Sequence, residues 1–94
     1  MCDAVVQEKA ISVQNEFGLH ARPAAQIAQE AQKFSSVIHI GMQGREIDAK
    51  SILDILSLAA PRGTDLFLKA EGCDAYEAVQ RIARLFEERF GEGR

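Results

Sequence analysis

Hydrophobic and polar residues alternate in four short segments, and a period of two residues predicts β-strands. These segments lie in residues 9–14, on both sides of a turn within residues 35–49, and in residues 64–70. Gly41 and Gly44 are expected to hold that turn, so that the second and third strands form a hairpin. The residues expected on the inward faces are Ile11, Val13, Ile38, Ile40, Ile47, Ala49, Leu66, Leu68 and Ala70.

Three other segments carry apolar residues at a helical period. The first is residues 22–34, with Pro23 in the first turn, where its missing N–H does no harm. The second is residues 51–60, opened by Ser51 and closed by Pro61 and Gly63. Asp74 and Glu77 predict a capping box for the third helix, which Gly91 ends. The expected buried residues of the first helix are Ala24, Ile27, Ala28, Ala31 and Phe34, and those of the third are Ala75, Val79, Ile82, Ala83, Phe86 and Phe90.

The predicted order is β-α-β-β-α-β-α, in an α/β (α+β) fold. Four strands with one apolar face need one cover, and three amphipathic helices can supply it. We therefore expect an open-faced sandwich, in which a four-stranded, mainly antiparallel sheet is covered on one face by three helices. Residues 1–94 are expected to form a single domain, with residues 1–5 as a loose tail. The outer face should carry Ser12, Gln14, His39, Glu46, Phe67 and Lys69.

Composition and charge narrow the range of partners. The net charge is −3 and the eleven basic residues are scattered, so no basic stripe is available for nucleic acid. No stretch has the length of a membrane span and no secretory leader is evident, which predicts a cytoplasmic protein without a membrane partner. Cys2 and Cys73 are far apart, so we expect two free thiols, no metal site and no cofactor. The charged residues near both termini are expected to be solvated.

His20 stands directly before the first predicted helix, in the stretch EFGLHARPAA. The first turn of a helix has backbone N–H groups without partners and a positive end of the dipole, so an anion on this imidazole would meet hydrogen-bond donors. Arg22 adds a planar cation suited to phosphate, and Gly18 allows the turn that exposes the ring. A neutral imidazole is a competent nucleophile, so the pattern favours phosphoryl transfer. A plain capping or packing role for His20 is equally compatible with this spacing.

The short helix at residues 51–60 is apolar almost all the way round. If Ile55 and Leu58 face the core, then Ile52, Leu53 and Leu56 are left toward solvent, which is typical of a protein-docking surface. Such a surface is expected to serve transient partners and to leave the protein monomeric. Ser51 is expected to be the N-cap, with Asp54 completing a capping-box-like arrangement. A phosphate on Ser51 would place negative charge beside this surface.

The stretches GLHARPAA and AKSILDILSLAAPRGT, together with the final helix, resemble HPr, the histidine-containing phosphocarrier of the bacterial phosphoenolpyruvate-dependent sugar phosphotransferase system. The resemblance runs from about residue 10 to residue 91. It implies that His20 is phosphorylated at Nδ1 by phospho-enzyme I and passes the phosphoryl group to IIA components of sugar permeases. Arg22 would stabilise the phosphate, and Ser51 would be the site of an HPr kinase/phosphorylase. The implied partner-binding residues are Ala21, Ile52, Leu53 and Leu56.

The resemblance leaves other functions open. The chain would be a stoichiometric carrier rather than a turnover enzyme, but a regulatory or nitrogen-related phosphorelay paralogue would carry the same motifs. In that alternative, phosphorylated Ser51 recruits a transcriptional regulator or an enzyme. An unrelated metal chaperone is disfavoured because the chain has no C-x-x-C motif. The chain also departs from the family in an N-terminal extension of about five residues and in Asp54, an acid within the docking helix.

Overall fold

The computed structural model describes residues 4–92 of the chain. Its elements follow the predicted order β-α-β-β-α-β-α and end in a short 3₁₀ turn, η1. The strands are β1 (Val5–Ser12), β2 (Val37–Met42), β3 (Arg45–Asp48) and β4 (Asp65–Gly72). The helices are α1 (Ala21–Ala31), α2 (Ile52–Ser57) and α3 (Ala75–Glu87), with η1 at Arg89–Gly91.

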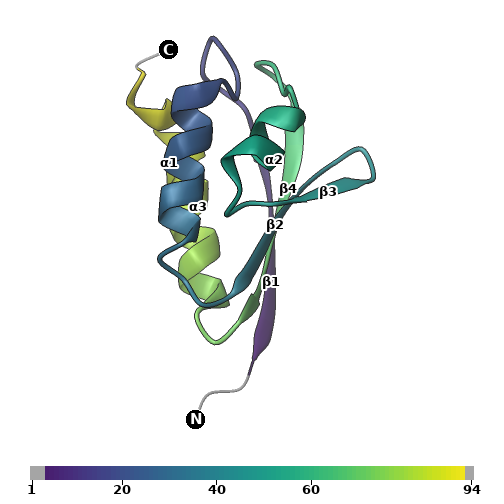
Figure 1. Cartoon of the computed structure of the whole chain (residues 1–94), viewed down its shortest axis with the longest axis vertical. Coiled ribbons are helices and arrows are strands. Elements are labelled where there is room, and N and C mark those ends of the chain that lie inside the picture. The colour runs from purple at the N-terminus through teal and green to yellow at the C-terminus, as the bar shows by residue number, and fades with distance from the viewer. Residues whose placement is uncertain (1–3, 93–94) are drawn as a thin grey trace.

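The four strands form one sheet in the order β1-β4-β2-β3, and every neighbouring pair is antiparallel. Helices α1 and α3 run in opposite directions against one face, and α2 lies beside the upper part of α1 (Figure 1). The fold is therefore the predicted open-faced sandwich. Because α3 runs back toward the start of α1, η1 lies at the end of the molecule opposite to the start of β1.

The core lies between this helical layer and the inner face of the sheet. The apolar stripe predicted for the first helix is buried at Ala24, Ile27, Ala28 and Ala31, whereas Phe34 is only partly buried. All six residues predicted for the last helix are buried, and so are the inward-facing residues of β2, β3 and β4. On the outer face Phe67 is 53% exposed, opposite Ala10 on β1 and Gly41 on β2.

Several boundaries differ from the sequence-based expectation. The first strand begins at Val5 rather than at Lys9. Val5 and Val6 are β-branched and pair with Gly72 and Glu71 at the end of β4. The rest of the predicted tail, apart from Ala4, lies outside the described residues. Gly41 is inside β2, and the hairpin turns at Gln43 and Gly44, which both have positive φ (50° and 82°).

Two further expectations at the C-terminal end of the chain are wrong. Asp74 is the N-cap residue of α3, but its side chain makes no capping bond to that helix. It instead accepts hydrogen bonds from the backbone N–H and hydroxyl groups of Ser35 and Ser36, which lie between α1 and β2. The last helix ends at Glu87, before residues with left-handed φ at Arg89 and Phe90 (53° and 57°).

The expectation of two free thiols is also wrong for Cys73, which is disulfide-bonded. A wide spacing of two cysteines excludes closely spaced metal and redox motifs, but it does not exclude a disulfide. Cys2 lies outside the described residues. Among the described residues, none of the helices is long and apolar enough to cross a membrane.

Candidate functional site

His20 is the N-cap residue of α1, as its place in the sequence predicts. The loop before it is fixed to the segment that follows α2, because Leu19 N–H donates to the carbonyl oxygen of Ala60 at 3.0 Å. Gly18 has a φ of 69°, and a Cβ on it would lie 2.4 Å from that same oxygen. Only glycine fits this close approach without displacing backbone. The two segments together hold His20 half-exposed at the start of the helix.

One nitrogen of the His20 ring is already occupied. Nε2 lies 2.7 Å from Oε2 of Glu92, whose other oxygen accepts a hydrogen bond from Nδ2 of Asn15 at 3.0 Å. Among the described residues, no group bonds to Nδ1. In a neutral imidazole one nitrogen carries the proton and the other carries a lone pair. An Nε2–H that donates to the carboxylate therefore leaves the lone pair on Nδ1, the nitrogen able to attack an electrophile.

The surroundings of His20 suit an anion. Arg22 is exposed and makes no hydrogen bond or ion pair with any described residue. Its guanidinium is therefore available to a phosphate, which it can bind through two parallel N–H groups. Pro23 has no N–H, so the first turn of α1 offers the backbone N–H groups of Ala21 and Arg22. These donors and the positive end of the helix dipole favour negative charge at this position.

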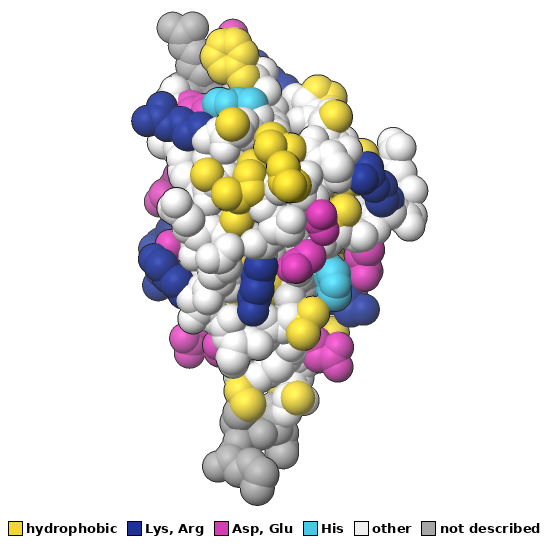
Figure 2. Space-filling model, viewed as in Figure 1, with side chains coloured by type: hydrophobic (Ala, Val, Ile, Leu, Met, Phe, Trp, Pro, Cys, Tyr) yellow, Lys and Arg dark blue, Asp and Glu magenta, His cyan; other side chains and the backbone are white. Residues whose placement is uncertain are grey.

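A patch of exposed apolar side chains begins beside the histidine and extends over α2. On α2, Leu53 is 78% exposed and Ile52 is 40% exposed, while Leu56 packs partly against the core. Figure 2 shows hydrophobic side chains gathered beside a histidine near the top of the view, with a basic side chain on the other side of that histidine. Phe17 adds a ring that is 74% exposed and meets His20 edge-on, with a centroid distance of 6.2 Å. We call Phe17, Ala21, Ile52, Leu53 and Leu56 the apolar rim.

Ser51 lies at the other end of α1. It is the N-cap of α2, and its hydroxyl oxygen accepts the N–H of Asp54 at 3.2 Å, which confirms the predicted cap. Gln32, just past the last residue of α1, donates its side-chain amide to the carbonyl oxygen of Lys50 at 2.9 Å. The 11 residues of α1 rise about 16 Å, so Ser51 and His20 are separated by roughly the length of that helix.

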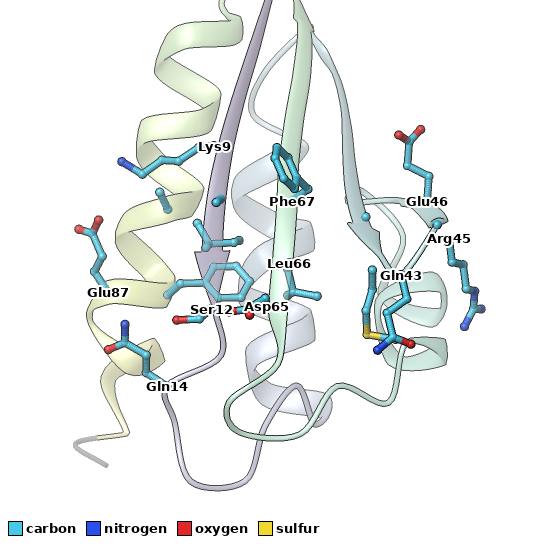
Figure 3. Close-up of a pocket in the computed structure, with 17 residues that line it drawn as sticks. Lys9, Ser12, Gln14, Gln43, Arg45, Glu46, Asp65, Leu66, Phe67 and Glu87 are labelled. Carbon is cyan, nitrogen blue, oxygen red and sulfur yellow. The ribbon is translucent and has the colours of Figure 1, made fainter.

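A depression lies around Phe67 and is lined by residues of β1, β4, the β2–β3 hairpin and α3. None of the residues predicted for the site lines it. Figure 3 shows Lys9 and Glu87 on one side of Phe67, and Arg45 and Glu46 on the other. The described part of the chain also holds no cluster of acidic, histidine and cysteine side chains that could bind a metal ion.

Three residues of this site were not predicted from the sequence: Asn15, Phe17 and Glu92. The expectation of solvated charges at the C-terminus is wrong for Glu92, whose side chain is only 14% exposed. Glu92 is 72 residues from His20 in the chain, and no local pattern indicates such a contact. Asn15 is fully buried, although its sequence context is that of a polar loop. Only Phe17, a large apolar residue in that loop, could have been noticed from the sequence.

Comparison with known proteins shows what the whole chain is similar to. A family model described as the PTS HPr component phosphorylation site matches residues 7–88. The chain is 41% identical over 85 residues to the phosphocarrier protein HPr of Xylella fastidiosa, a match that covers 90% of this chain and 96% of the relative.

Solved structures agree as well. The crystal structure of HPr from Thermoanaerobacter tengcongensis matches with a TM-score of 0.88 and 44% identity, and covers 92% of this chain and 97% of that one. The structure of Crh, a catabolite-repression protein of Bacillus subtilis described as a dimer with a swapped domain, matches with a TM-score of 0.72 and 40% identity. That match covers 90% of this chain and 97% of Crh.

Proposed function

Since this chain belongs to the HPr family of the phosphotransferase system, we propose that it accepts a phosphoryl group on His20 from phospho-enzyme I and passes it to IIA components of sugar permeases. The observation that carries this proposal is the state of the His20 ring. The ring is half-exposed at the start of α1, Nε2 is occupied by Glu92, and no described residue bonds to Nδ1.

The residues around the ring support phosphoryl transfer rather than another reaction of an imidazole. Transfer of this kind depends mainly on positioning and on stabilising charge, and it needs no deep pocket in the carrier. Arg22 and the N–H groups at the start of α1 would bind the phosphate oxygens while the group is attached to Nδ1. The donor and the acceptor proteins would supply the remaining groups, which makes this chain a carrier rather than a turnover enzyme.

The proposal is tested by incubating the protein with phosphoenolpyruvate and enzyme I and measuring its mass. We expect one acid-labile phosphoryl group on the native protein and on the control variant His39→Ala, and none on His20→Ala. His39 is a suitable control because it lies on the outer face of β2 and not at a helix terminus. A native protein without a mass change, or a phosphoryl group retained in His20→Ala, would contradict the proposal.

The apolar rim is the surface on which we propose that enzyme I and the IIA components bind. Leu53, Ile52 and Phe17 are its most exposed large side chains, and all are available to a partner that approaches the ring. We further propose that residues 1–94 form a single cytoplasmic domain. We also propose that it acts as a monomer, because a dimer built on the apolar rim would compete with those partners. Light scattering of the purified protein tests this, and a stable dimer would contradict it.

For Ser51 we propose regulatory phosphorylation by an HPr kinase/phosphorylase. A phosphate on the N-cap of α2 would favour the start of that helix, although Asp54 in the first turn would repel it. It would stand beside Ile52 and Leu53, where its charge would hinder an acidic partner. With ATP and the kinase we expect acid-stable phosphate on the native protein and on Ser57→Ala, and none on Ser51→Ala. Phosphate found elsewhere, or none on the native protein, would contradict this role.

A second candidate function is favoured by the similarity to Crh, which is described as a catabolite-repression protein. In this case the chain is a regulatory or nitrogen-related paralogue, and its Ser51-phosphorylated form binds a transcriptional regulator without serving sugar transport. Transfer assays separate the two functions. Passage of the phosphoryl group from His20 to a sugar-permease IIA component favours the carrier. Failure of that passage, together with capture of a regulator only by the Ser51-phosphorylated form, favours the paralogue.

A further inference from the structure

The contact between Glu92 and His20 carries an inference beyond the phosphoryl site itself. The Glu92 carboxylate accepts on both oxygens, from the His20 ring at 2.7 Å and from Asn15 Nδ2 at 3.0 Å. Its side chain is 14% exposed, whereas that of His20 is 39% exposed. The carboxylate is therefore more buried than the ring that it contacts, and part of the imidazole stays accessible to solvent.

A sharp corner in the backbone brings Glu92 to this place. Arg89, Phe90 and Gly91 all have positive φ, at 53°, 57° and 76°. Two consecutive non-glycine residues in this region are strained and persist only where other contacts hold them. Phe90 supplies such contacts, because its ring is 4% exposed and packs edge-on against Phe86 with a centroid distance of 4.9 Å. Gln26 of α1 also donates its side-chain amide to the carbonyl oxygen of Phe90 at 3.1 Å.

The orientation of the Asn15 amide determines which kind of group can form a hydrogen bond with it. This residue is fully buried, and its Nδ2 also donates to the carbonyl oxygen of Gly18 at 2.7 Å. Oδ1 of Asn15 is buried without a hydrogen-bond partner among the described residues. The reverse orientation of the amide would place that oxygen against the carboxylate and the Gly18 carbonyl oxygen, which repel it. Asn15 therefore presents a donor to Glu92 and requires an acceptor there.

We propose that Glu92 is a positioning residue that holds the proton of His20 on Nε2 and so makes Nδ1 the phosphoryl acceptor, with Asn15 fixing the carboxylate. The inference rests on the proposed function and assigns a role to a residue that the function does not require by itself. A carboxylate bonded to a ring nitrogen fixes the tautomer of an imidazole in the same way at many metal and catalytic sites.

The phosphoryl step can be written with these groups. The lone pair of Nδ1 forms the N–P bond as the bond between phosphorus and the leaving atom of phospho-enzyme I breaks, and that electron pair stays with enzyme I. Nε2 keeps its proton, so the ring gains a positive charge that the Glu92 carboxylate stabilises. When an acceptor attacks phosphorus, the N–P electron pair returns to Nδ1 and the ring is neutral again. Glu92 thus stabilises the phosphorylated ring without exchanging a proton.

Glu92→Gln tests the role of this residue in fixing the tautomer of His20 more sharply than Glu92→Ala does. A glutamine that offers its oxygen to Asn15 presents its NH₂ to Nε2, which must then accept a hydrogen bond, and the ring proton moves to Nδ1. Glu92→Ala removes the restraint without imposing this wrong tautomer. We expect Glu92→Gln to slow phosphorylation by enzyme I about tenfold or more, Glu92→Ala to slow it less, and Glu88→Gln, at an exposed glutamate in the same tail, to have no effect.

The tautomer itself is measured by two-bond ¹H–¹⁵N correlation spectra of the imidazole rings, at about pH 8, where an ordinary histidine is neutral. The native protein and Glu88→Gln should show the proton of His20 on Nε2, and Glu92→Gln should show it on Nδ1. A native ring protonated on Nδ1 would overturn the inference even if the variants failed to fold. Equal rates and equal tautomers in the native protein and Glu92→Gln would overturn it too.

The two proposals fail in different ways. If the native protein were not phosphorylated on His20 at all, the proposed function would fall, and the spectra would still report whether Glu92 sets the tautomer. If the native protein were phosphorylated normally and Glu92→Gln matched it, the function would stand and the role of Glu92 would be lost. A loss of rate in Glu92→Ala greater than that in Glu92→Gln would indicate a packing role for this residue and would also overturn the inference.

Discussion

At the scale of single residues, position decides the chemistry of the two histidines. His39 lies in the middle of β2 opposite Asp48. His20 stands at the start of α1, near backbone N–H groups and an arginine that bond to none of the residues the structure describes. The sequence was sufficient to place His20 at a helix start, because glycine, proline and the apolar period after it are local patterns. It was not sufficient to find Asn15 and Glu92, because their roles depend on contacts between distant parts of the chain.

Replacing Arg22 with alanine should separate phosphate binding from folding. The side chain is exposed and bonds to no described residue, so the free energy of unfolding should change by no more than about 0.5 kcal/mol. The rate of phosphorylation by enzyme I should fall about 10- to 100-fold, the equivalent of a lost charge-assisted contact to phosphate. Arg84→Ala, at an exposed position on α3, is the control and should keep the native rate. A native rate in Arg22→Ala would exclude the role proposed for Arg22.

At the scale of elements, Ser51 and Asp74 both have the sequence pattern of a helix N-cap, but only the side chain of Ser51 makes the capping hydrogen bond. Ser51 caps α2 because its hydroxyl oxygen has the N–H of Asp54 within reach. Asp74 does not cap α3 with its side chain, because its carboxylate bonds instead to Ser35 and Ser36 in the segment between α1 and β2. A capping box describes neighbours along the chain only, and a cluster of donors from another segment competes successfully for a carboxylate. The Asp74 carboxylate thus joins the start of α3 to the segment before β2.

This link should make stability depend on acid in a defined range. The Ser36 hydroxyl, followed by the backbone N–H of Ser35, holds the pKa of Asp74 at about 2, below the ordinary 3.8. Because the folded pKa is the lower one, the link stabilises the fold above pH 3.8 and loses its effect as the pH falls toward 2. Asp74→Asn should therefore reduce the free energy of unfolding by about 1 to 2 kcal/mol at neutral pH.

Urea unfolding of both proteins across the acid range measures this effect. The difference between native protein and Asp74→Asn should be constant above about pH 5 and should shrink as the pH approaches 2. Ser57→Ala serves as a control for the loss of an exposed polar group. A difference that stayed the same down to the lowest pH would mean that the ionised carboxylate does not make the link.

At the scale of the whole molecule, the hydrophobic pattern predicted which residues are buried better than it predicted how the segments are arranged. Alternation identified the inner face of the sheet because one face must be covered. The strand order β1-β4-β2-β3 and the return of Glu92 to the start of α1 follow from packing of whole elements, and no single segment encodes them. The apolar period predicted too long a last helix, because Phe90 is buried although it lies in η1, beyond the end of α3.

The same architecture places exposed apolar side chains beside His20, and one substitution tests their purpose. Leu53 is 78% exposed, so Leu53→Ser should leave the free energy of unfolding nearly unchanged. It should weaken binding to enzyme I about tenfold, as calorimetry would show, because the partner loses an apolar contact. Tyr76→Ser alters a residue that is 59% exposed in the first turn of α3, at the other end of the molecule, and should bind normally. Equal affinity of both variants for enzyme I would contradict the docking surface.

The most direct test of this account is to identify which atom carries the phosphoryl group after reaction with phosphoenolpyruvate and enzyme I. Nitrogen-15 and phosphorus-31 spectra of the phosphorylated protein distinguish the two ring nitrogens of His20 from each other and from His39. The account predicts a single phosphoryl group on Nδ1 of His20, with a proton retained on Nε2 beside Glu92. A phosphoryl group on Nε2, or on any residue other than His20, would contradict it.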